Sequence, residues 1–364
     1  MFGLISNFFA SGAHPIGVDF GTHALRLAQV QTEDGDYKLF AAASAEIPDN
    51  ARDDAEARFE FFSHTIPHLL HTGKFRAHRA VLGLPPSVVH TQHLALDPMD
   101  QKLLKDAVVD CAKQKIPFDA EHALFRHTVA GQTRDSEDPR LHVIVMSADT
   151  RWVNRFITAA GKAGLYIVGL NMQPPALLDC FSNIYRRTAE QQSVRMYVDI
   201  GSSGSRAFIA QNTHLLFARN LTIGGDDLTR AVADALSISL HDARTLRIKL
   251  AAGSASDGSQ VEAACRHVAD ELIKQLEACR REHELAFPHL AVHRLIFVGG
   301  EARQESLCKY VAQTLKLPGQ TGDSLCRMAR RSRIDIESAI DRRYPQPAWA
   351  AAIGLSMGRE EAEG

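Results

Sequence analysis

Two short loops carry the residue types that bind phosphate. The first is Asp19-Phe20-Gly21-Thr22 and the second is Asp199-Ile200-Gly201-Ser202, each set between apolar stretches. Glycine lets the backbone approach a ligand closely, and successive N–H groups in such a turn form a concavity that binds anions. A carboxylate there would repel phosphate unless a cation lay between them. The pattern therefore predicts Mg²⁺ held through water by Asp19 and Asp199.

A basic residue follows the first loop. Arg26 lies four residues beyond Thr22, so the two side chains can emerge on the same face of the next strand. Arg26 could then reach a phosphate oxygen. One turn of this kind is common and is weak evidence for a site. The second copy, 180 residues later, favours a pair of loops that grip the phosphates of one nucleotide.

The elements around the loops repeat as well. In the first half, alternation in IGVDFG, ALRLAQVQ and KLFAAASAEI predicts three antiparallel strands, followed by a helix over 51–73 and the buried strand RAVLGLP. The second half repeats this opening in MYVDIGSSGSRAFIAQ and THLLFARNLTI, continues with a helical pattern over 226–287, and reaches a strand with a glycine pair in HRLIFVGGEAR. The residues between, 87–164, read as strand, helix, strand, strand, helix. Two similar halves predict a bilobed α/β protein with a cleft between the lobes.

Composition excludes several classes of protein. The 364 residues are 45% hydrophobic and 23% charged, and the formal net charge of −2 gives no basic excess that would indicate nucleic acid. No run approaches the ~20 apolar residues of a membrane helix, and the first residues lack the basic start of a signal peptide. The cysteines form no C-x-x-C pair, which is typical of a reducing cytoplasm; they are Cys111, Cys180, Cys265, Cys279, Cys308 and Cys326.

The order IGVDFGTHALR, MYVDIGSSGSR, LIFVGGEA resembles the actin-like ATPase superfamily, which includes actin, sugar kinases, DnaK-type chaperones and FtsA. Within it the chain is similar to the PilM family of type IV pilus assembly proteins. That likeness is carried by MFGLISNFF, by LPPSVVHTQHLALDPMDQKLLKDAVVDCAKQKIPFDAE and by LTIGGDDLTRAVADALSISLHDARTLR. It implies a bilobed actin-like ATPase fold of two related RNase-H-like lobes, with a small α+β subdomain inserted in the first. The implied extents are 1–86 and 165–194 for the first lobe, 87–164 for the inserted subdomain, 195–225 and 290–358 for the second lobe, and 226–289 for its helical subdomain.

The resemblance also implies a function. A member of this family is expected to be a cytoplasmic component of the inner-membrane pilus platform that binds ATP and Mg²⁺ between its lobes. It is expected to hold the N-terminal cytoplasmic tail of a PilN-like membrane protein, against the strand near 87–96, and to self-associate into a ring. The nucleotide ligands it implies are Asp19, Gly21, Thr22, Arg26, Asp199, Gly201, Ser202, Ser203, Gly225, Arg247, Gly299 and Gly300.

Two positions depart from the superfamily pattern. Arg244 stands where a ribose-binding glutamate is usual. Glu301 follows the glycine pair at a position where a small residue is usual, and its longer side chain would crowd the adenine. These departures favour an alternative, a nucleotide-less scaffold of a secretion system (GspL-like). A small-molecule kinase needs a general base in the cleft, and none stands out, because Gln173 and Asp179 are better interpreted as a helix start and a surface acid. An FtsA-like filament protein would end in an amphipathic helix, unlike the acidic end of this chain.

Other patterns have simpler explanations. His64, His68 and His71 have helical spacing, but Pro67 interrupts them and no acid or cysteine joins them, so a metal site is disfavoured. His90 and His93 would face opposite sides of a strand. The basic group Arg327, Arg330, Arg331 and Arg333 is expected to be a solvated loop. A membrane-grazing anchor, a disordered leader and a self-association segment all remain open for Phe2, Leu4, Ile5, Phe8 and Phe9.

Overall fold

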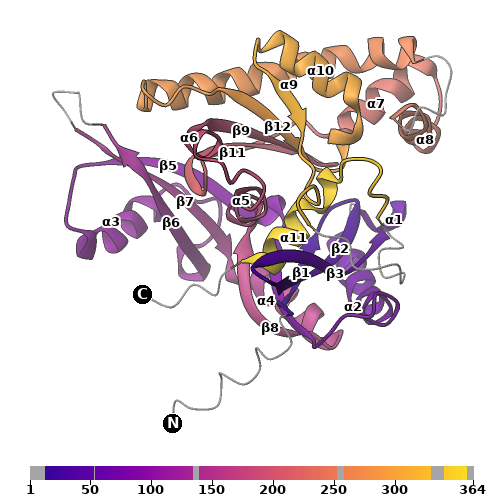
Figure 1. The fold of residues 1–364 in the computed structure, drawn as a ribbon, viewed down its shortest axis with the longest axis horizontal. Coiled ribbons are helices and arrows are strands. Elements are labelled where there is room, and N and C mark those ends of the chain that lie inside the picture. The colour runs from indigo at the N-terminus through magenta and orange to yellow at the C-terminus, as the bar shows by residue number, and fades with distance from the viewer. Residues whose placement is uncertain (1–12, 53, 134–138, 252–257, 329–339, 359–364) are drawn as a thin grey trace. The chain divides into compact units, whose positions relative to one another are not determined.

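The computed structural model describes residues 13–52, 54–133, 139–251, 258–328 and 340–358. Contacts divide the chain into two compact units. Unit 1 comprises Met1–Val89, Asp149–Tyr185 and Asp323–Gly364, and unit 2 comprises His90–Ala148 and Arg186–Gly322. The chain therefore leaves and re-enters unit 1 twice, as the colours of Figure 1 show.

The sheet of unit 1 has five strands in the order β3-β2-β1-β4-β8. They are β1 (Ile16–Phe20), β2 (Ala24–Glu33), β3 (Asp36–Glu46), β4 (Arg79–Leu84) and β8 (Tyr166–Met172). β1, β2 and β3 form the predicted antiparallel meander, whereas β4 and β8 run parallel to β1. All five residues of β1 are buried, which places Asp19 at the end of a strand in the centre of the sheet.

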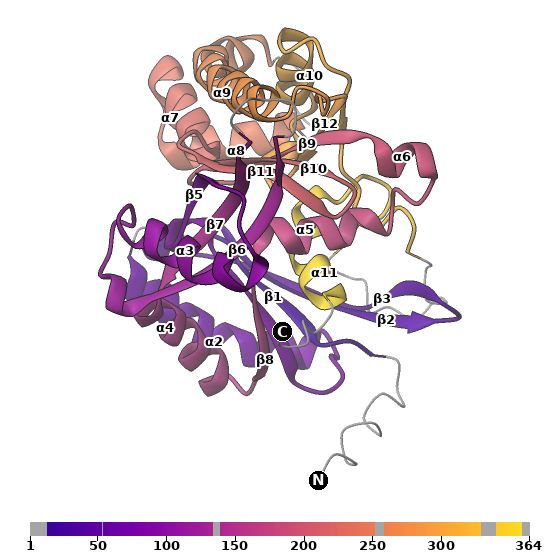
Figure 2. The same cartoon turned by 90° about the vertical axis from the view of Figure 1, so that its left-hand side faces the viewer.

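The described helices that accompany this sheet are α1 (Asp49–Arg52), α2 (Ala55–Thr72), α4 (Thr150–Lys162), α5 (Gln173–Ser182) and α11 (Ala350–Met357). Figure 2 shows α2 and α4 side by side, and their aromatic rings meet Phe20 of β1. α11 packs closely against β1, because a Cβ on Gly17 would lie 2.0 Å from the carbonyl oxygen of Ala352. It packs as closely against α5, since a Cβ on Gly354 would lie 1.8 Å from the carbonyl oxygen of Ala176.

The sheet of unit 2 has the same topology, with strand order β11-β10-β9-β12-β13. Its strands are β9 (Val194–Ile200), β10 (Ser205–Gln211), β11 (His214–Leu221), β12 (Arg294–Val298) and β13 (Gly319–Thr321). The first three are antiparallel, and β12 and β13 run parallel to β9, so the predicted internal repeat is confirmed at the level of topology. Its helices are α6 (Thr188–Gln192), α7 (Gly225–Leu236), α8 (Leu240–Ala251), α9 (Ser259–Ala286) and α10 (Glu305–Thr314).

A three-stranded sheet, of order β5-β7-β6, follows the first segment of unit 1 along the chain. β5 (Val89–Leu96), α3 (Gln101–Lys113), β6 (Ala123–Gln132) and β7 (Leu141–Asp149) precede α4, as the pattern of 87–164 predicts. Leu94, Leu104, Val108, Val143 and Val145 form its core. Contacts group this sheet with unit 2 and α11 with unit 1. The division into four subdomains with the extents given above stays a prediction.

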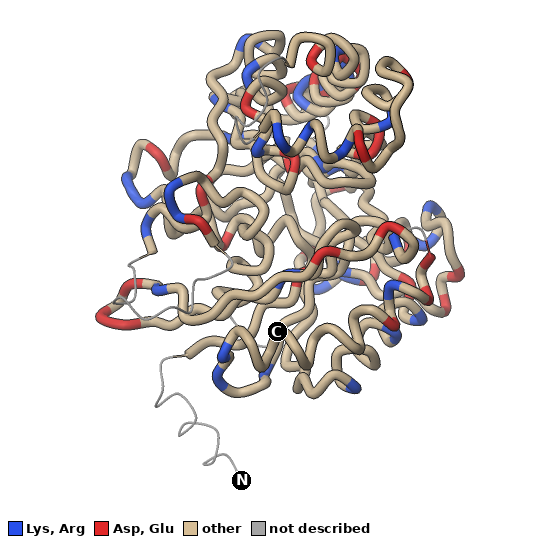
Figure 3. Tube along the Cα trace, turned by 90° about the vertical axis from the view of Figure 1, so that its right-hand side faces the viewer, with Lys and Arg blue, Asp and Glu red and all other residues tan. Residues whose placement is uncertain are grey.

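Charged residues of both signs are interspersed along the elements of each unit (Figure 3). Among the described residues, no helix is both long and apolar enough to cross a membrane. Arg327 precedes the gap at 329–339, and Arg330, Arg331 and Arg333 lie outside the described residues. The aromatic segment from Phe2 to Phe9 also lies outside them.

Candidate functional site

The first loop joins β1 to β2 and places Asp19 beside α5. Asp19 is 6% exposed and lies opposite Arg26 in the β1–β2 ladder. The side-chain amide of Gln173, the first residue of α5, donates a 2.6 Å hydrogen bond to Oδ1 of Asp19. Interpreting Gln173 as a helix start alone was therefore incomplete, because its side chain also positions the acid.

Gln173 provides a test of whether a metal ion fits this loop. Its side chain is buried, and no described residue forms a hydrogen bond with Oε1. A buried acceptor without a partner calls for an explanation. A water molecule bound to Mg²⁺ would donate to it, and Asp19 next to it supplies the negative charge that Mg²⁺ requires. The residues of the first loop therefore fit a hydrated magnesium ion.

The two glycines of the loops occupy equivalent tight turns. A Cβ on Gly21 would lie 2.6 Å from the carbonyl oxygen of Ala24, and a Cβ on Gly201 would lie 2.7 Å from that of Gly204. Neither turn accommodates a side chain at the glycine position. Both turns also leave a partly buried hydroxyl, of Thr22 or Ser202, in the next position.

The acid of the second loop is paired with an arginine of the next strand. Asp199 of β9 forms an ion pair with Arg206 of β10, with both side chains about one-tenth exposed. The ladder places Asp199 opposite Arg206, as it places Asp19 opposite Arg26. Sequence reasoning singled out Arg26 and missed Arg206, although the seven-residue spacing from acid to arginine is the same in both loops. The charge of Asp199 is thus already neutralised by an internal cation.

The amino end of α7 lies against the second loop. The backbone N–H groups of Gly225 and Asp226 donate to the carbonyl oxygens of Gly201 and Ser202, at 2.9 and 2.8 Å. The side chain of Asp226, which sequence reasoning did not single out, accepts from Oγ of Ser202 and from Arg244, both at 2.9 Å. Arg244 is therefore paired with an acid of the loop region.

The glycine pair after β12 also contacts the second loop. Gly299 has φ +88°, and a Cβ there would lie 2.4 Å from Oδ1 of Asp199 and 2.5 Å from the carbonyl oxygen of Ile200. Gly300 is exposed, and a Cβ on it would meet nothing within 4 Å. The second and third motifs of the sequence thus meet at Asp199.

Arg247 of α8 forms a partly buried ion pair with Glu301. Arg247 is 3% exposed and donates to Oε2 of Glu301 at 2.5 Å, to the carbonyl oxygen of Gly225 at 2.8 Å and to Oγ1 of Thr229 at 2.7 Å. Gln304 donates to the same oxygen of Glu301 at 2.7 Å. Glu301, one of the two departures from the superfamily pattern, is therefore paired with Arg247, which was predicted as a nucleotide ligand.

The predicted ligands fall into two groups. Asp19, Gly21, Thr22 and Arg26 come together in unit 1, and Asp199, Gly201, Ser202, Gly225, Arg247 and Gly299 come together in unit 2, with Ser203 and Gly300 exposed nearby in sequence. Over the described part of the chain, no three His, Cys, Asp or Glu side chains gather as a metal site. Whether these residues bind a nucleotide stays a prediction.

The family model for type IV pilus assembly protein PilM matches residues 17–360. The chain belongs to this family. A solved PilM–PilN type IV pilus biogenesis complex matches with a TM-score of 0.77 and 23% identity over 94% of this chain and 98% of that chain. Ethanolamine utilization protein EutJ from Carboxydothermus hydrogenoformans matches with a TM-score of 0.52 and 14% identity over 95% of this chain and 89% of that chain. This PilM-family chain has the actin-like ATPase fold, with two lobes of mixed sheets, as predicted.

Proposed function

We propose that this chain is the cytoplasmic actin-like component of a type IV pilus assembly platform, binding ATP with Mg²⁺ through both loops and the tail of a PilN-like membrane protein. The observation that carries the nucleotide part is the duplicated loop. In each unit an acid, a glycine and a hydroxyl end the central strand of a sheet of the same topology. Membership of the PilM family supports the pilus part.

Each residue has a defined task in this proposal. The loop N–H groups and the hydroxyls of Thr22 and Ser202 bind phosphate oxygens. Asp19 and Gln173 hold a hydrated Mg²⁺, which neutralises phosphate charge when bound. On the other loop, Arg206 offsets the charge of Asp199 and lowers its repulsion of phosphate. We assign no general base, so the proposal is nucleotide binding and includes no rate of hydrolysis.

Calorimetric titration of the full chain with ATP tests this proposal. We expect saturable binding with Mg²⁺ that weakens by at least about tenfold in Asp19→Asn, because loss of one charge-assisted contact costs roughly 1.5–3 kcal/mol. Asp36→Asn, at the exposed first residue of β3, is the matched control and should bind as the wild type does. Equal affinity of Asp19→Asn and wild type would overturn the role of the first loop.

A nucleotide-less scaffold is the second candidate, and specific contacts favour it. Asp199, Asp226 and Glu301 are each paired with an arginine of the same unit, so internal cations already occupy three acids around the second loop. Absence of ATP binding by the intact chain, at concentrations up to millimolar, would establish this candidate. The partner proposal below would then stand alone.

The edge of β5 supports the proposed partner site. In its sheet β5 pairs with β7 alone, over the described residues. One face is covered by α3, since Gln92 donates to the carbonyl oxygen of Ala112 at 3.2 Å and Leu94 packs in the core. The other face is covered by β11, since His93 donates to the carbonyl oxygen of Ala218 at 2.9 Å. The strand edge remains for an extended peptide to pair with.

Hydrogen exchange measured by mass spectrometry tests this site. A synthetic peptide of the PilN-like protein's N-terminal tail should slow amide exchange over 89–96, because an added strand forms hydrogen bonds with the edge of β5. A scrambled peptide of the same composition should leave exchange unchanged. Saturable binding that protects other segments and leaves 89–96 unprotected would show that the tail docks elsewhere.

A further inference from the structure

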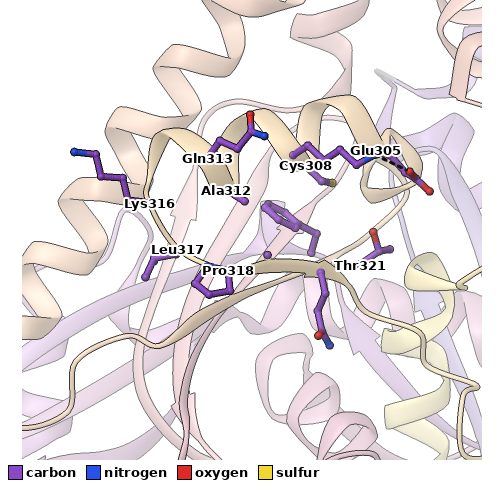
Figure 4. Close-up of a pocket in the computed structure, with 12 residues that line it drawn as sticks. Glu305, Cys308, Ala312, Gln313, Lys316, Leu317, Pro318 and Thr321 are labelled. Atoms are coloured by element: carbon purple, nitrogen blue, oxygen red, sulfur yellow. Dashed lines mark hydrogen bonds and ion pairs between the residues drawn. The ribbon is translucent and has the colours of Figure 1, made fainter.

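A groove runs along α10 at the far edge of the sheet of unit 2. Its cavity has a volume of about 540 Å³ and lies between one face of α10 and the segment that contains β13 (Figure 4). Phe297, Leu317 and Pro318 form the apolar part of its lining. A Cβ on Gly319 would lie 2.7 Å from Cβ of Ala312, so the close approach of strand and helix requires glycine at this position.

The strand that borders this groove has an open edge. β13 ends the strand order, and among the described strands it pairs with β12 alone. The carbonyl oxygen of Pro318 accepts from the N–H of Leu295, and the N–H of Gly322 donates to the carbonyl oxygen of Phe297, both at 2.8 Å. The even-numbered residues of the 318–322 segment therefore turn their backbone N–H and C=O groups toward β12. In a parallel pair, the residues between them turn theirs away. The backbone N–H and C=O groups of Gly319 and Thr321 therefore point away from β12. No described residue outside the β12–β13 ladder forms a hydrogen bond with them.

The charges around the groove favour an acidic ligand. Two lysines of the α10 region, Lys309 and Lys316, line it, together with one acid, Glu305. Glu305 is already paired with Lys309 at 3.3 Å. Lys316 is exposed and forms no ion pair with any residue that the structure describes. A bound segment would gain from a carboxylate near Lys316 and from an apolar side chain over Phe297 and Leu317.

We propose that the groove between α10 and β13 binds an extended, acidic and apolar segment of a partner protein, which pairs with β13 as a sixth strand of the sheet. Backbone hydrogen bonds to Gly319 and Thr321 would supply affinity, and alternate side chains would supply specificity. This site is separate in sequence from both phosphate loops and from β5. The proposal for this groove can therefore be tested independently of the proposed function.

The probe is a capped six-residue peptide of alternating glutamate and valine, with the lysine–valine peptide as its charge-reversed control. Titration into ¹⁵N-labelled full chain should move the amide resonances of Gly319 and Thr321 in a saturable way. The lysine peptide should bind at least about fivefold more weakly, because it places like charges beside Lys316. Equal binding of the two peptides, or no saturable shift at Gly319 and Thr321, would overturn the proposal.

Two pairs of variants locate the contact. Thr321→Pro removes an outward N–H and should reduce glutamate-peptide binding by about tenfold or more. Thr321→Val also changes the side chain but keeps the N–H, so it should bind normally. Lys316→Glu should weaken binding, whereas Lys162→Glu on α4 should not. Full binding by both Thr321→Pro and Lys316→Glu would refute the site. If the wild-type chain dimerises and Thr321→Pro is monomeric, the occupant is a second copy, and the proposed acidic partner is wrong.

Discussion

Among single residues, Gly299 joins two of the motifs that predict nucleotide binding. Its φ of +88° favours glycine, and its Cα faces the carboxylate of Asp199. In Gly299→Ala we expect a free energy of unfolding lower by about 1–3 kcal/mol, because a side chain strains this backbone and collides with Asp199. Urea denaturation measures the loss. ATP affinity should fall as well if Asp199 is displaced from the second loop.

Gly300 provides the matched control for Gly299. It is the next residue, it is exposed, and a Cβ there has no neighbour within 4 Å. Gly300→Ala should change the free energy of unfolding by no more than about 0.5 kcal/mol. Similar destabilisation by both substitutions would mean that general flexibility of this turn, and not contact with Asp199, sets its stability.

Between elements, histidines connect the three-stranded sheet to β11 and α9. His93 of β5 stacks on Phe217 of β11 with ring centroids 4.4 Å apart. His142 of β7 lies edge-on to Phe287 with ring centroids 5.1 Å apart, and its buried Nε2 has no hydrogen-bond partner among the residues that the structure describes. His283 of α9 donates to the carbonyl oxygen of Leu290 at 2.7 Å. The contacts of His93 and His142 join the three-stranded sheet to β11 and to the end of α9.

These histidines make the stability of unit 2 depend on pH. Burial lowers the pKa of His93, His142 and His283, although the Ala218 carbonyl and Glu282 oppose the shift at His93, and the Leu290 carbonyl and Glu284 oppose it at His283. A folded-state pKa below the unfolded value means that the unfolded chain binds more protons. The contribution of these histidines to the free energy of unfolding is complete above the unfolded pKa of about 6.5. It is lost as pH falls from there through the folded values.

Urea denaturation between pH 5 and 8 measures this effect. The free energy of unfolding should fall as pH drops below about 6.5, by up to roughly 1.4 kcal/mol per pH unit for each histidine involved. His142→Gln should flatten the slope, whereas His64→Gln, at an exposed position of α2, should preserve it. An identical slope in wild type and His142→Gln would show that His142 is not one of the groups responsible.

For the whole molecule, the sequence predicts what is periodic or repeated. The two loops, the meanders and the strand–helix order of 87–164 follow from local patterns, and they are present as expected. The partners of the site residues do not follow, because Gln173 reaches Asp19 across 154 positions and Arg247 reaches Glu301 across 54. Such contacts depend on how elements pack, which periodicity in one segment does not reveal. Arg206 is the exception, since its spacing from Asp199 duplicates that of Arg26 from Asp19.

The packing of α11 sets an order of events during synthesis. Oγ of Ser356 donates to the carbonyl oxygen of Pro15 at 2.7 Å and accepts from the N–H of Val30 at 2.9 Å, which joins residues more than 300 positions apart. All of unit 2 lies before residue 323 in the chain, whereas unit 1 includes Asp323–Gly364. A ribosome therefore releases every part of unit 2 while β1 still lacks its covering helix. The lobe whose first strands are translated first is therefore completed after the other lobe.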